Sequence, residues 1–243
     1  MGGLAELISA TRHDRLVVVE KSLDELEDNP VNDYVMRKLG SINLAELSKK
    51  FGLQVTYPLA FTDIETTGTK RVFSIASLAY TLVEKDNLTS TCIFPPTFRL
   101  EKEALIYFFQ NVGNGTLFTW NGASFDIPRI SDRARQRGVV ANGSPETTFR
   151  EHVKDRHVDL CRKRKEFGLP SGKGYGKLQT LERVEFGYER EDDIPGKMIP
   201  QAYRTWVHTR TNPEEIAQLI EHNIQDTVSL LAIMLRFCEL CPK

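Results

Sequence analysis

Two carboxylates lie two residues apart in a run of mostly apolar, β-branched and aromatic residues, Leu59-Ala-Phe-Thr-Asp63-Ile-Glu65. Such a run predicts a strand, and side chains two apart on a strand point to the same face. Neighbouring carboxylates repel each other unless a cation lies between them. The pair therefore indicates either a metal site or a strand end with two solvated acids, and this string alone supports both interpretations equally.

Two further strings carry polar side chains that could join this pair. The string Trp120-Asn-Gly-Ala-Ser-Phe-Asp126 follows a short predicted strand, so Asp126 lies at the sheet edge, as a metal ligand or as a helix N-cap. The string Glu221-His222-Asn-Ile-Gln-Asp226 lies in a predicted helix, where His222 and Asp226 share one face. Alone, this second string also describes a common surface pair.

Hydrophobic periodicity predicts the elements that must position these residues. Three strand patterns between residues 59 and 94 are followed by a helix over 101–111 and a short strand over 116–120. A helix then runs from the Asn-Gly turn towards Arg137, and a last helix spans about 213–240. This order predicts an α/β fold, with a mixed sheet that is flanked by helices.

The first 57 residues predict a short helical extension in front of a main domain, residues 58–243. Asn29 is a candidate N-cap for one helix, and a second helix is expected over 44–51. The second helix resembles the start of a helix-turn-helix, but Pro58 and a strand-like run follow where a recognition helix should be. We therefore expect the extension to pack on the main domain, where it could also contact a protein partner.

Taken in order, the three strings resemble the DEDD superfamily of 3′–5′ exonucleases, the DnaQ-like branch of the ribonuclease-H-like fold. More narrowly, the chain resembles the predicted YprB-like ribonuclease-H branch. That branch carries three further strings that are found here as His157-Val-Asp159-Leu160, Leu178-Gln-Thr180-Leu-Glu182 and Ile194-Pro195-Gly196. The resemblance extends from about Leu59 to Phe237.

The resemblance implies phosphodiester hydrolysis with two divalent cations, Mg²⁺ or Mn²⁺, which would clamp the attacking and leaving oxygens. Carboxylate oxygens suit such hard cations. Asp63 would bridge both cations, and Asp126 would serve the second one. Glu65 and Asp226 would complete the site that holds the nucleophilic water. His222 would deprotonate or orient that water, because an imidazole titrates near neutral pH.

The position of the histidine departs from the family pattern. The histidine subfamily separates its His from the last Asp by four residues, and the tyrosine subfamily separates its Tyr by three. Three residues separate His222 from Asp226, so His222 has the Tyr-type position. On a helix this position is rotated by about 100° from the His-type position, because the two differ by one residue. Its role as a general base or in positioning water therefore stays open. His157 is a second candidate, although packing or capping beside Asp159 explains it more simply.

Further residues are predicted to contact a nucleic-acid strand. The backbone after the first two acids would meet the terminal nucleotide, where Gly68 permits close approach and Thr67 offers a hydroxyl group. Basic residues further along the chain would follow the phosphates. The predicted substrate contacts are Thr66, Thr67, Gly68, Asn121, Phe125, Arg162, Lys163, Arg164, Lys165, Lys173 and Lys177.

The net charge of the whole chain conceals a basic segment. The 243 residues carry 32 Lys and Arg against 33 Asp and Glu, a net charge of −1, which argues against a protein that coats long nucleic acid. Residues 129–177 carry 13 basic and 6 acidic residues, a net charge of +7. The rest of the chain carries 19 against 27, a net charge of −8. This distribution fits an enzyme that grips one strand end.

Composition and cysteine content indicate the class of protein and its compartment. Hydrophobic residues make up 40% and charged residues 27%, which excludes wholesale disorder, and no apolar run has the length of a bilayer span. Cys238 and Cys241 could form half of a Zn²⁺ site, but no second pair lies near them, so plain thiols are the preferred interpretation. Without a disulfide framework, a reducing, cytoplasmic location is expected.

These observations predict a metal-dependent 3′–5′ exonuclease that acts on single-stranded DNA or RNA ends, as in DNA repair. One alternative is a catalytically weak nuclease fold that serves as a nucleic-acid-binding or assembly module. Another is a metallohydrolase of small phosphate esters. The presence of all four acids disfavours the first alternative, and the second gives no reason for the basic segment.

Overall fold

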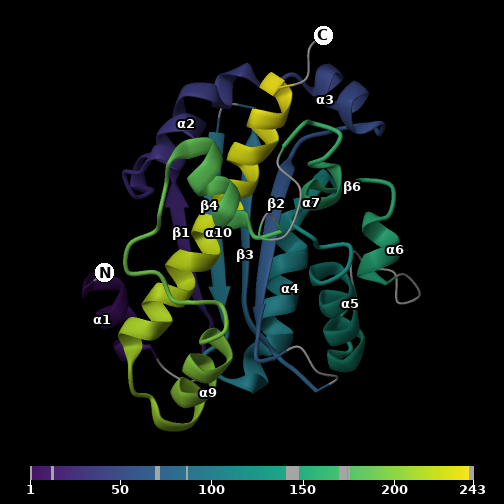
Figure 1. Ribbon diagram of the computed structural model, residues 1–243. Helices are drawn as coiled ribbons and strands as arrows, with labels where there is room; N and C mark the ends of the chain where they lie inside the picture. The colour runs from purple at the N-terminus through teal and green to yellow at the C-terminus, as the bar shows by residue number, and fades with distance from the viewer. Residues whose placement is uncertain are drawn as a thin grey trace.

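Six strands form one mixed sheet in the computed structural model, which describes residues 2–11, 14–68, 72–85, 87–140, 148–169, 174 and 176–240. The strands are β1 (Val17–Ser22), β2 (Leu59–Thr66), β3 (Ile75–Glu84), β4 (Asn87–Phe94), β5 (Thr116–Thr119) and β6 (His157–Asp159). Their order in the sheet is β1-β4-β3-β2-β5-β6 (Figure 1). The first four of these are antiparallel neighbours, whereas β5 runs parallel to β2 and to β6.

Helices cover both faces of the sheet. They are α1 (Gly2–Ala10), α2 (Pro30–Lys38), α3 (Leu44–Phe51), α4 (Glu101–Val112), α5 (Asp126–Arg137), α6 (Phe149–Val153), α7 (Leu160–Lys163), α8 (Leu178–Leu181), α9 (Ile199–Thr209) and α10 (Pro213–Leu240). Shorter turns are η1 (Leu23–Glu25), η2 (Leu39–Ser41), η3 (Phe98–Leu100) and the π-helical η5 (Glu182–Phe186). One apolar cluster joins the sheet to α10, α1, α2, α3 and α9, and a second joins it to α4, α5 and α6. The predicted α/β architecture is confirmed.

The first 57 residues contribute a strand to the sheet as well as helices. The helix predicted to begin beside Asn29 is α2, and the Asn29 side chain accepts hydrogen bonds from the backbone N–H groups of Val31 and Asn32, both at 3.0 Å. Before it, β1 pairs with β4 at the sheet edge. The prediction of helix therefore does not hold for residues 17–22, whose short and half-exposed sequence lacks a clear alternation. The domain boundary at residue 57 stays a prediction.

Alternation along β2 sends its side chains to opposite faces of the sheet. Phe61 points into the cluster beneath α10, whereas Ala60 and Ile64 point into the cluster beneath α4. Asp63 and Glu65 have the parity of Phe61, so they lie on the face that α10 covers. The apolar residues of the strand thus decide where its two acids point.

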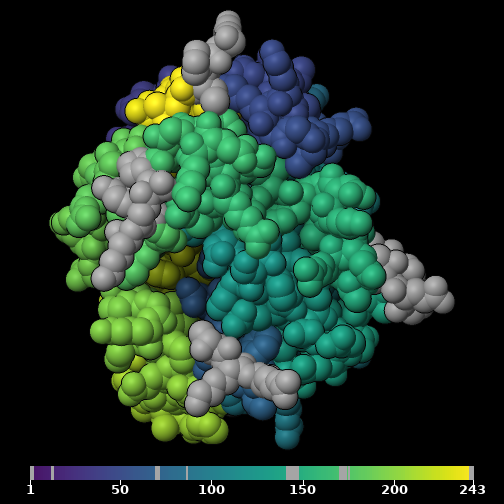
Figure 2. Space-filling view, turned by 45° about the vertical axis from the view of Figure 1, so that its right-hand side comes forward, coloured from purple at the N-terminus to yellow at the C-terminus, as the bar shows by residue number. Residues whose placement is uncertain are grey.

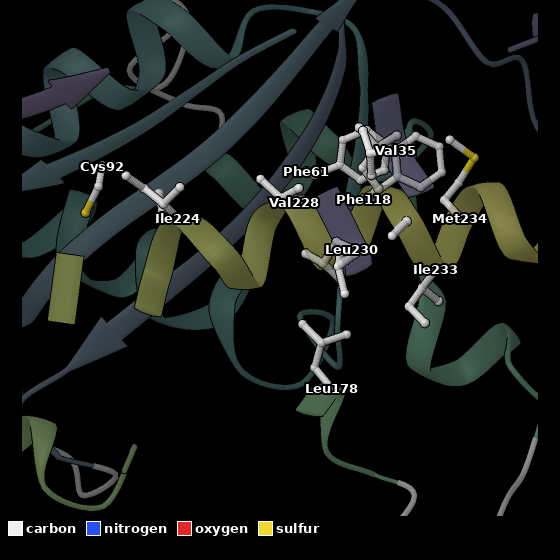
Figure 3. Packing of buried hydrophobic residues seen from close by; sticks show 14 of the residues in the cluster. Val35, Phe61, Cys92, Phe118, Leu178, Ile224, Val228, Leu230, Ile233 and Met234 are labelled. Atoms are coloured by element: carbon white, nitrogen blue, oxygen red, sulfur yellow. The ribbon is translucent and has the colours of Figure 1, made fainter. Parts of the chain in front are cut away.

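The helix α10 is buried on nearly every side along much of its length. The rings of Phe61 and Phe118 stack with their centroids 4.8 Å apart, and Val228, Leu230 and Met234 of α10 belong to the same cluster (Figure 3). Burial on all sides is typical of a core helix. This packing fixes the place of the polar side chains that the preceding turns of α10 carry.

Candidate metal centre

The carboxyl ends of β2 and β5 and the middle of α10 meet at one edge of the sheet. Because β2 and β5 are parallel neighbours, the acids of β2 lie beside the turn that follows β5. Asp126 begins α5 after this turn, and its Oδ1 accepts a hydrogen bond of 3.2 Å from the backbone N–H of Ile64. His222 and Asp226 approach from α10. The structure thereby brings together all four predicted acids and the predicted histidine.

His222 lies among the acidic side chains. Its Nε2 is 3.5 Å from Oε1 of Glu65 and 3.5 Å from Oδ2 of Asp226. One ligand atom from each of these three residues lies within 4.8 Å of the others. Asp63 adjoins the same group, where the charges of Asp226, Asp126 and Glu65 all act on its carboxyl group. The Tyr-type position on α10 therefore points His222 towards the acids.

Asn223 holds the carboxylate of Asp63 from the helix side. Its Nδ2 donates a hydrogen bond of 2.7 Å to Oδ2 of Asp63, and its Oδ1 accepts one of 2.7 Å from the hydroxyl of Ser77. Asn223 is fully buried, so these two partners fix the orientation of its amide. Asn223 was not predicted as a site residue, although a polar residue in an otherwise apolar helix stripe is a usable signal.

Burial and mutual repulsion oppose ionisation of the carboxyl groups when no cation is bound. Burial first, and then the charges of Asp226, Asp126 and Glu65, raise the pKa of Asp63 well above its ordinary value. Burial raises the pKa of Asp126 to about 7, and it also raises the pKa of Glu65. A cation would offset this negative charge, and four carboxylates with one imidazole are donors that suit Mg²⁺ or Mn²⁺. The residues present therefore fit a divalent metal centre.

The charge on His222 depends on the same carboxylates. Burial alone would lower its pKa, but Asp226, Asp193 and Glu65 outweigh burial and raise the pKa well above its ordinary value. Its Nδ1 is 2.7 Å from Oδ1 of Asp193, and with the ring protonated this nitrogen is the donor. The ring can accept a proton only after the surrounding negative charge has been offset.

These pKa shifts predict that the metal-free protein loses stability as the pH rises. A group with a raised pKa holds its proton in the folded protein where the unfolded chain has released it, so the free energy of unfolding falls with rising pH. For Asp126 this window runs from about pH 4 to about pH 7, and for His222 it begins near pH 6.5 and extends upwards. As the pH rises through these windows, we expect the melting temperature in EDTA to fall by roughly 5 °C. For this chain length, that fall corresponds to a loss of about 2 kcal/mol in the free energy of unfolding.

Calorimetry at a series of pH values, in EDTA and in Mg²⁺, measures this effect. Mg²⁺ should restore most of the lost stability, and more at the alkaline end, because ligands must be deprotonated to bind it. The variant Asp126→Asn should flatten the dependence on pH. A melting temperature that rises with pH in EDTA would contradict the raised pKa values of Asp126 and His222.

Asp159, at the end of β6, holds the turn that precedes Asp126. Its Oδ1 accepts a hydrogen bond of 3.0 Å from the backbone N–H of Asn121, and its Oδ2 accepts one of 3.2 Å from that of Ala123. Asn121 has a φ of 60°, a left-handed conformation that asparagine adopts more readily than most residues. The string His-x-Asp-Leu therefore shapes the turn that presents Asp126.

His157 packs against β5 and does not join the acids. Its Nε2 is 2.8 Å from Oγ1 of Thr119, and burial lowers its pKa to about 4. Gly122 packs on the same threonine, and a Cβ atom at residue 122 would lie 2.3 Å from Oγ1 of Thr119. Glycine is therefore required in this turn. The geometry favours the packing interpretation of His157 over a catalytic one.

The predicted substrate contacts after β2 form hydrogen bonds within the protein. The hydroxyl of Thr67 accepts a hydrogen bond of 2.9 Å from the backbone N–H of Ser74. The backbone carbonyl of Thr67 accepts one of 2.8 Å from the guanidinium of Arg204. The hydroxyl of Thr66 donates one of 3.1 Å to the carbonyl of Gly68. These bonds shape the backbone at the end of β2, while contact with a nucleotide stays a prediction.

Basic side chains lie beside the turn after β5. Arg162 donates a hydrogen bond of 2.8 Å to the hydroxyl of Ser124, and the guanidinium of Arg164 lies 5.9 Å from the ring centroid of Trp120. Lys163 is paired with Glu166 at 2.9 Å. Among the other predicted contacts, Phe125 is half-buried, with the guanidinium of Arg129 over its ring. Three more are exposed: Asn121, Lys165 and Lys177. Lys173 lies outside the described residues.

The surroundings of the centre are hollowed on one face of the molecule. Figure 2 shows this hollow between α9, α5 and the segment that holds α7 and α8, with atoms of β2 and α10 at its floor. Of the acids, Glu65 and Asp226 are partly exposed, at 19% and 16%, whereas Asp126 is buried.

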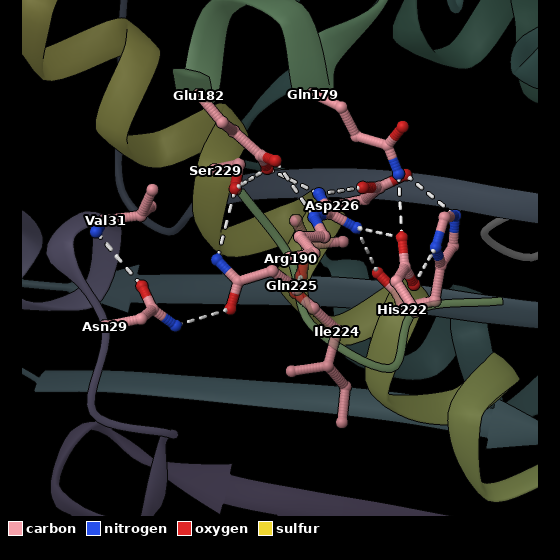
Figure 4. Close-up of polar contacts among 12 residues, drawn as sticks. Asn29, Val31, Gln179, Glu182, Arg190, His222, Ile224, Gln225, Asp226 and Ser229 are labelled. Atoms are coloured by element: carbon pink, nitrogen blue, oxygen red, sulfur yellow. Dashed lines mark hydrogen bonds and ion pairs between the residues drawn. The ribbon is translucent and has the colours of Figure 1, made fainter. Parts of the chain in front are cut away.

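Two charged side chains in the loop after η5 were not predicted from the sequence. Arg190 forms ion pairs with Glu182 and Asp226 (Figure 4). The carboxylate of Asp193 bonds the ring of His222. In the sequence both lie in a run of charges that resembles a solvated loop. Glu182 ends the string Leu-x-Thr-Leu-Glu and is fully buried, which gives that string a structural role.

Two further predictions concern residues away from the centre. Cys238 is half-buried in α10 with its Sγ 3.9 Å from Sδ of Met234, and Cys241 lies outside the described residues, so the Zn²⁺ half-site stays an alternative. Among the helices of the described ranges, none combines the length and the apolar character needed to cross a membrane.

The chain is similar to known proteins in sequence and in fold. It is 25% identical over 177 residues to the uncharacterised protein YprB of Bacillus subtilis (strain 168), a match that covers 72% of this chain and 40% of YprB. The chain therefore spans about 40% of the length of this curated relative. The family B DNA polymerase from the hyperthermophilic archaeon Pyrobaculum calidifontis matches with a TM-score of 0.55 and 19% identity, over 75% of this chain and 25% of the polymerase chain. This second likeness concerns the fold.

A family model described as RNase_H superfamily matches residues 60–238. The matched segment runs from β2 into the last turns of α10, and it contains the four acids, the histidine and the sheet edge that joins them. The mixed six-stranded sheet with helices on both faces agrees with this match. The chain belongs to the RNase_H superfamily.

Proposed function

We propose that this protein is a metal-dependent exonuclease that removes nucleotides from the 3′ ends of single-stranded DNA or RNA. The observation that carries the proposal is the meeting of four carboxylates with His222 at one sheet edge of a ribonuclease-H-like fold. The superfamily supports a nuclease. The order of the acidic strings supports the DEDD branch and, with it, attack from the 3′ end.

The side chains of the centre have separate tasks in this proposal. Two cations, Mg²⁺ or Mn²⁺, would be held by Asp63, Glu65, Asp126 and Asp226, and when bound they supply electrostatic stabilisation to the phosphate under attack. Asn223 orients the carboxylate of Asp63. His222 directs Nε2 towards Glu65 and Asp226, where it can hold the attacking water or accept a proton from it.

The basic and aromatic side chains beside the turn after β5 support a strand as the substrate rather than a small phosphate ester. Arg162 and Arg164 lie beside the turn after β5, where Arg164 lies over the ring of Trp120 and Arg129 over that of Phe125. Cationic side chains interleaved with aromatic rings are typical of single-strand binding. A cytoplasmic location, a part in DNA repair and a protein partner at the N-terminal segment stay predictions from the sequence.

Cleavage of end-labelled single strands tests the proposal. A 5′-labelled strand incubated with Mg²⁺ or Mn²⁺ should give a ladder that shortens from the 3′ end, and EDTA should abolish it. A 3′-phosphorothioate linkage should block the ladder at its first step. Matched DNA and RNA strands in the same assay measure the preference for the sugar, which depends on contacts with the 2′-hydroxyl.

The alternatives predict different results in the same assay. A binding or assembly module would retain the labelled strand in a salt-dependent manner without shortening it. A hydrolase of small phosphate esters would cleave a nitrophenyl phosphate and leave the strand intact. Either result, obtained with protein that binds Mn²⁺, would exclude the exonuclease.

Alanine at residues 162–165 should reduce the dependence of strand binding on salt. Each phosphate contact with a single strand contributes about 0.7 to the slope of log K against log salt. Because Lys163 is paired with Glu166 and Arg162 lies 3.4 Å from Asp159, we expect the slope to fall by that of about two contacts, roughly 1.4, rather than by that of four.

Fluorescence anisotropy at a series of salt concentrations, in EDTA so that no cleavage occurs, measures this slope. The matched control is Lys102→Ala on α4, which covers the opposite face of the sheet and should leave the slope unchanged. An unchanged slope in the four-residue variant would place the phosphate track elsewhere on the surface.

A further inference from the structure

Two side chains of the loop between η5 and α9 adjoin the proposed metal centre without being among its ligands. Arg190 and Asp193 are 6% and 14% exposed, whereas Glu189, Glu191 and Asp192 of the same loop are exposed. Ile194, which follows them, is buried in the main apolar cluster. The loop is therefore anchored so that two of its charges point inwards.

Asp193 contacts the ring of His222. Its Oδ1 is 2.7 Å from Nδ1 of His222, and its Oδ2 accepts a hydrogen bond of 2.8 Å from Nε2 of Gln179. With Nδ1 held in this way, Nε2 is the ring nitrogen that faces Glu65 and Asp226. A carboxylate that holds one nitrogen of an imidazole fixes the direction of the other.

Arg190 bonds one of the two carboxylate oxygens of Asp226 and leaves the other towards His222. Its guanidinium bonds Oδ1 of Asp226, while Oδ2 is the oxygen that lies 3.5 Å from Nε2 of His222 (Figure 4). The nitrogen that bonds Asp226, Nη2, also bonds Glu182 at 2.5 Å, and Nε donates a second hydrogen bond of 2.9 Å to Glu182. Arg190 is thus held by a buried acid while it holds an acid of the centre.

The helix turn that begins with Glu182 contributes to this arrangement. Gln179 and Glu182 are three residues apart, one turn of α8 and η5, and each bonds one of the two loop side chains. Glu182 also accepts a hydrogen bond from the hydroxyl of Ser229 of α10. The string Leu-x-Thr-Leu-Glu therefore connects α10 with the loop that reaches the centre.

We propose that Asp193 and Arg190 are positioning residues of the metal centre. Asp193 sets the ring of His222 so that Nε2 faces the reacting water, and Arg190 sets the carboxylate of Asp226 so that Oδ2 is presented to a cation. The inference deepens the proposed function and rests on it. It predicts different losses at the two residues, because one acts through the histidine and the other through a ligand.

Mn²⁺ binding, followed by the electron paramagnetic resonance signal of the free ion, and nuclease kinetics together test this inference. The variant Arg190→Lys keeps the charge but loses the planar guanidinium, which bonds Glu182 through two nitrogens and also bonds Asp226. It should raise the Kd for Mn²⁺ about 10-fold. The variant Asp193→Asn should lower kcat about 10-fold or more, and leave the Kd for Mn²⁺ and the KM for the strand within about twofold. A general loosening of the fold would change all of these quantities together.

Matched controls come from the same part of the chain. Arg183→Lys and Asp192→Asn make the same substitutions at exposed residues, and both should behave like the wild type. In a His222→Ala background, Asp193→Asn should cause no further loss of kcat, because its effect passes through the histidine. A further loss of about 10-fold in that background, or Mn²⁺ binding by Arg190→Lys like that of the wild type, would overturn the inference.

The test separates this inference from the proposed function. If the wild type binds Mn²⁺ but cleaves no strand, the exonuclease and the role of Asp193 in its kcat fall together, while the Kd of Arg190→Lys still decides the role of Arg190. If the wild type cleaves strands and the Arg190 and Asp193 variants match their controls, the positioning roles fail and the exonuclease stands. A wild type that binds no Mn²⁺ would overturn both.

Discussion

Asparagine in place of Asp63 should lower the rate of strand cleavage roughly 10³-fold or more while it raises the stability of the metal-free protein. A bound metal is worth several kcal/mol of transition-state stabilisation, at about 1.4 kcal/mol for each factor of ten. Stability should rise because the substitution removes a buried carboxyl group whose ionisation is opposed by burial and by the charges of Asp226, Asp126 and Glu65. The asparagine Oδ1 can still accept the hydrogen bond from Asn223.

Single-turnover cleavage and calorimetry in EDTA measure the two effects. Mg²⁺ should stabilise the wild type and leave Asp63→Asn nearly unchanged, because the variant lacks one of the four carboxylates that we propose as cation ligands. The exposed acid of Asp132→Asn on α5 serves as the control, and neither quantity should change there. Full activity in Asp63→Asn would remove this residue from the metal centre. Lower stability in EDTA would contradict the repulsion that we infer.

Alanine in place of Glu182 should lower the free energy of unfolding by about 3–5 kcal/mol, as expected when one partner of a buried ion pair is removed. Glu182 is fully buried and bonds Arg190 and the hydroxyl of Ser229. Without Glu182, the guanidinium of Arg190 keeps its ion pairs with Asp226 and Asp193, but its Nε loses the carboxylate that it bonds. For a chain of this length the melting temperature should fall by roughly 6–20 °C.

Thermal or denaturant unfolding measures this loss. Glu182→Gln keeps an acceptor for one hydrogen bond and should lose less stability than the alanine variant. The control Glu189→Ala removes an exposed acid of the same region, which lies 3.7 Å from Arg183, and should change the free energy of unfolding by less than about 0.5 kcal/mol. Equal losses in Glu182→Ala and Glu189→Ala would show that the buried ion pair adds no stability.

Much of the centre could be predicted from residues that are local in the sequence. The alternation of β2 determines that Asp63 and Glu65 share a face, and the helical period places His222 and Asp226 on one side of α10. The Asn-Gly turn and the acid after it locate Asp126. These relations hold for any packing of the elements, because they follow from strand and helix geometry alone.

The residues that could not be predicted are those whose burial depends on distant partners. Arg190 and Asp193 are chemically like the exposed charges next to them, and only their distances to Asp226 and His222 distinguish them. The strand β1 was missed for a related reason, since an edge strand is recognised by its pairing with β4 rather than by its own pattern.

The sequence by itself determined which side chains could hold cations, on which face of their own element each lies, and in which segment the positive charge is concentrated. The tertiary structure decided that the parallel pairing of β2 with β5 and the packing of α10 bring these faces together. It also decided which nitrogen of His222 and which oxygen of Asp226 are directed at the centre. The physical reason is that periodicity fixes directions within one element, whereas distances between elements are set by the burial of apolar side chains far apart in the chain.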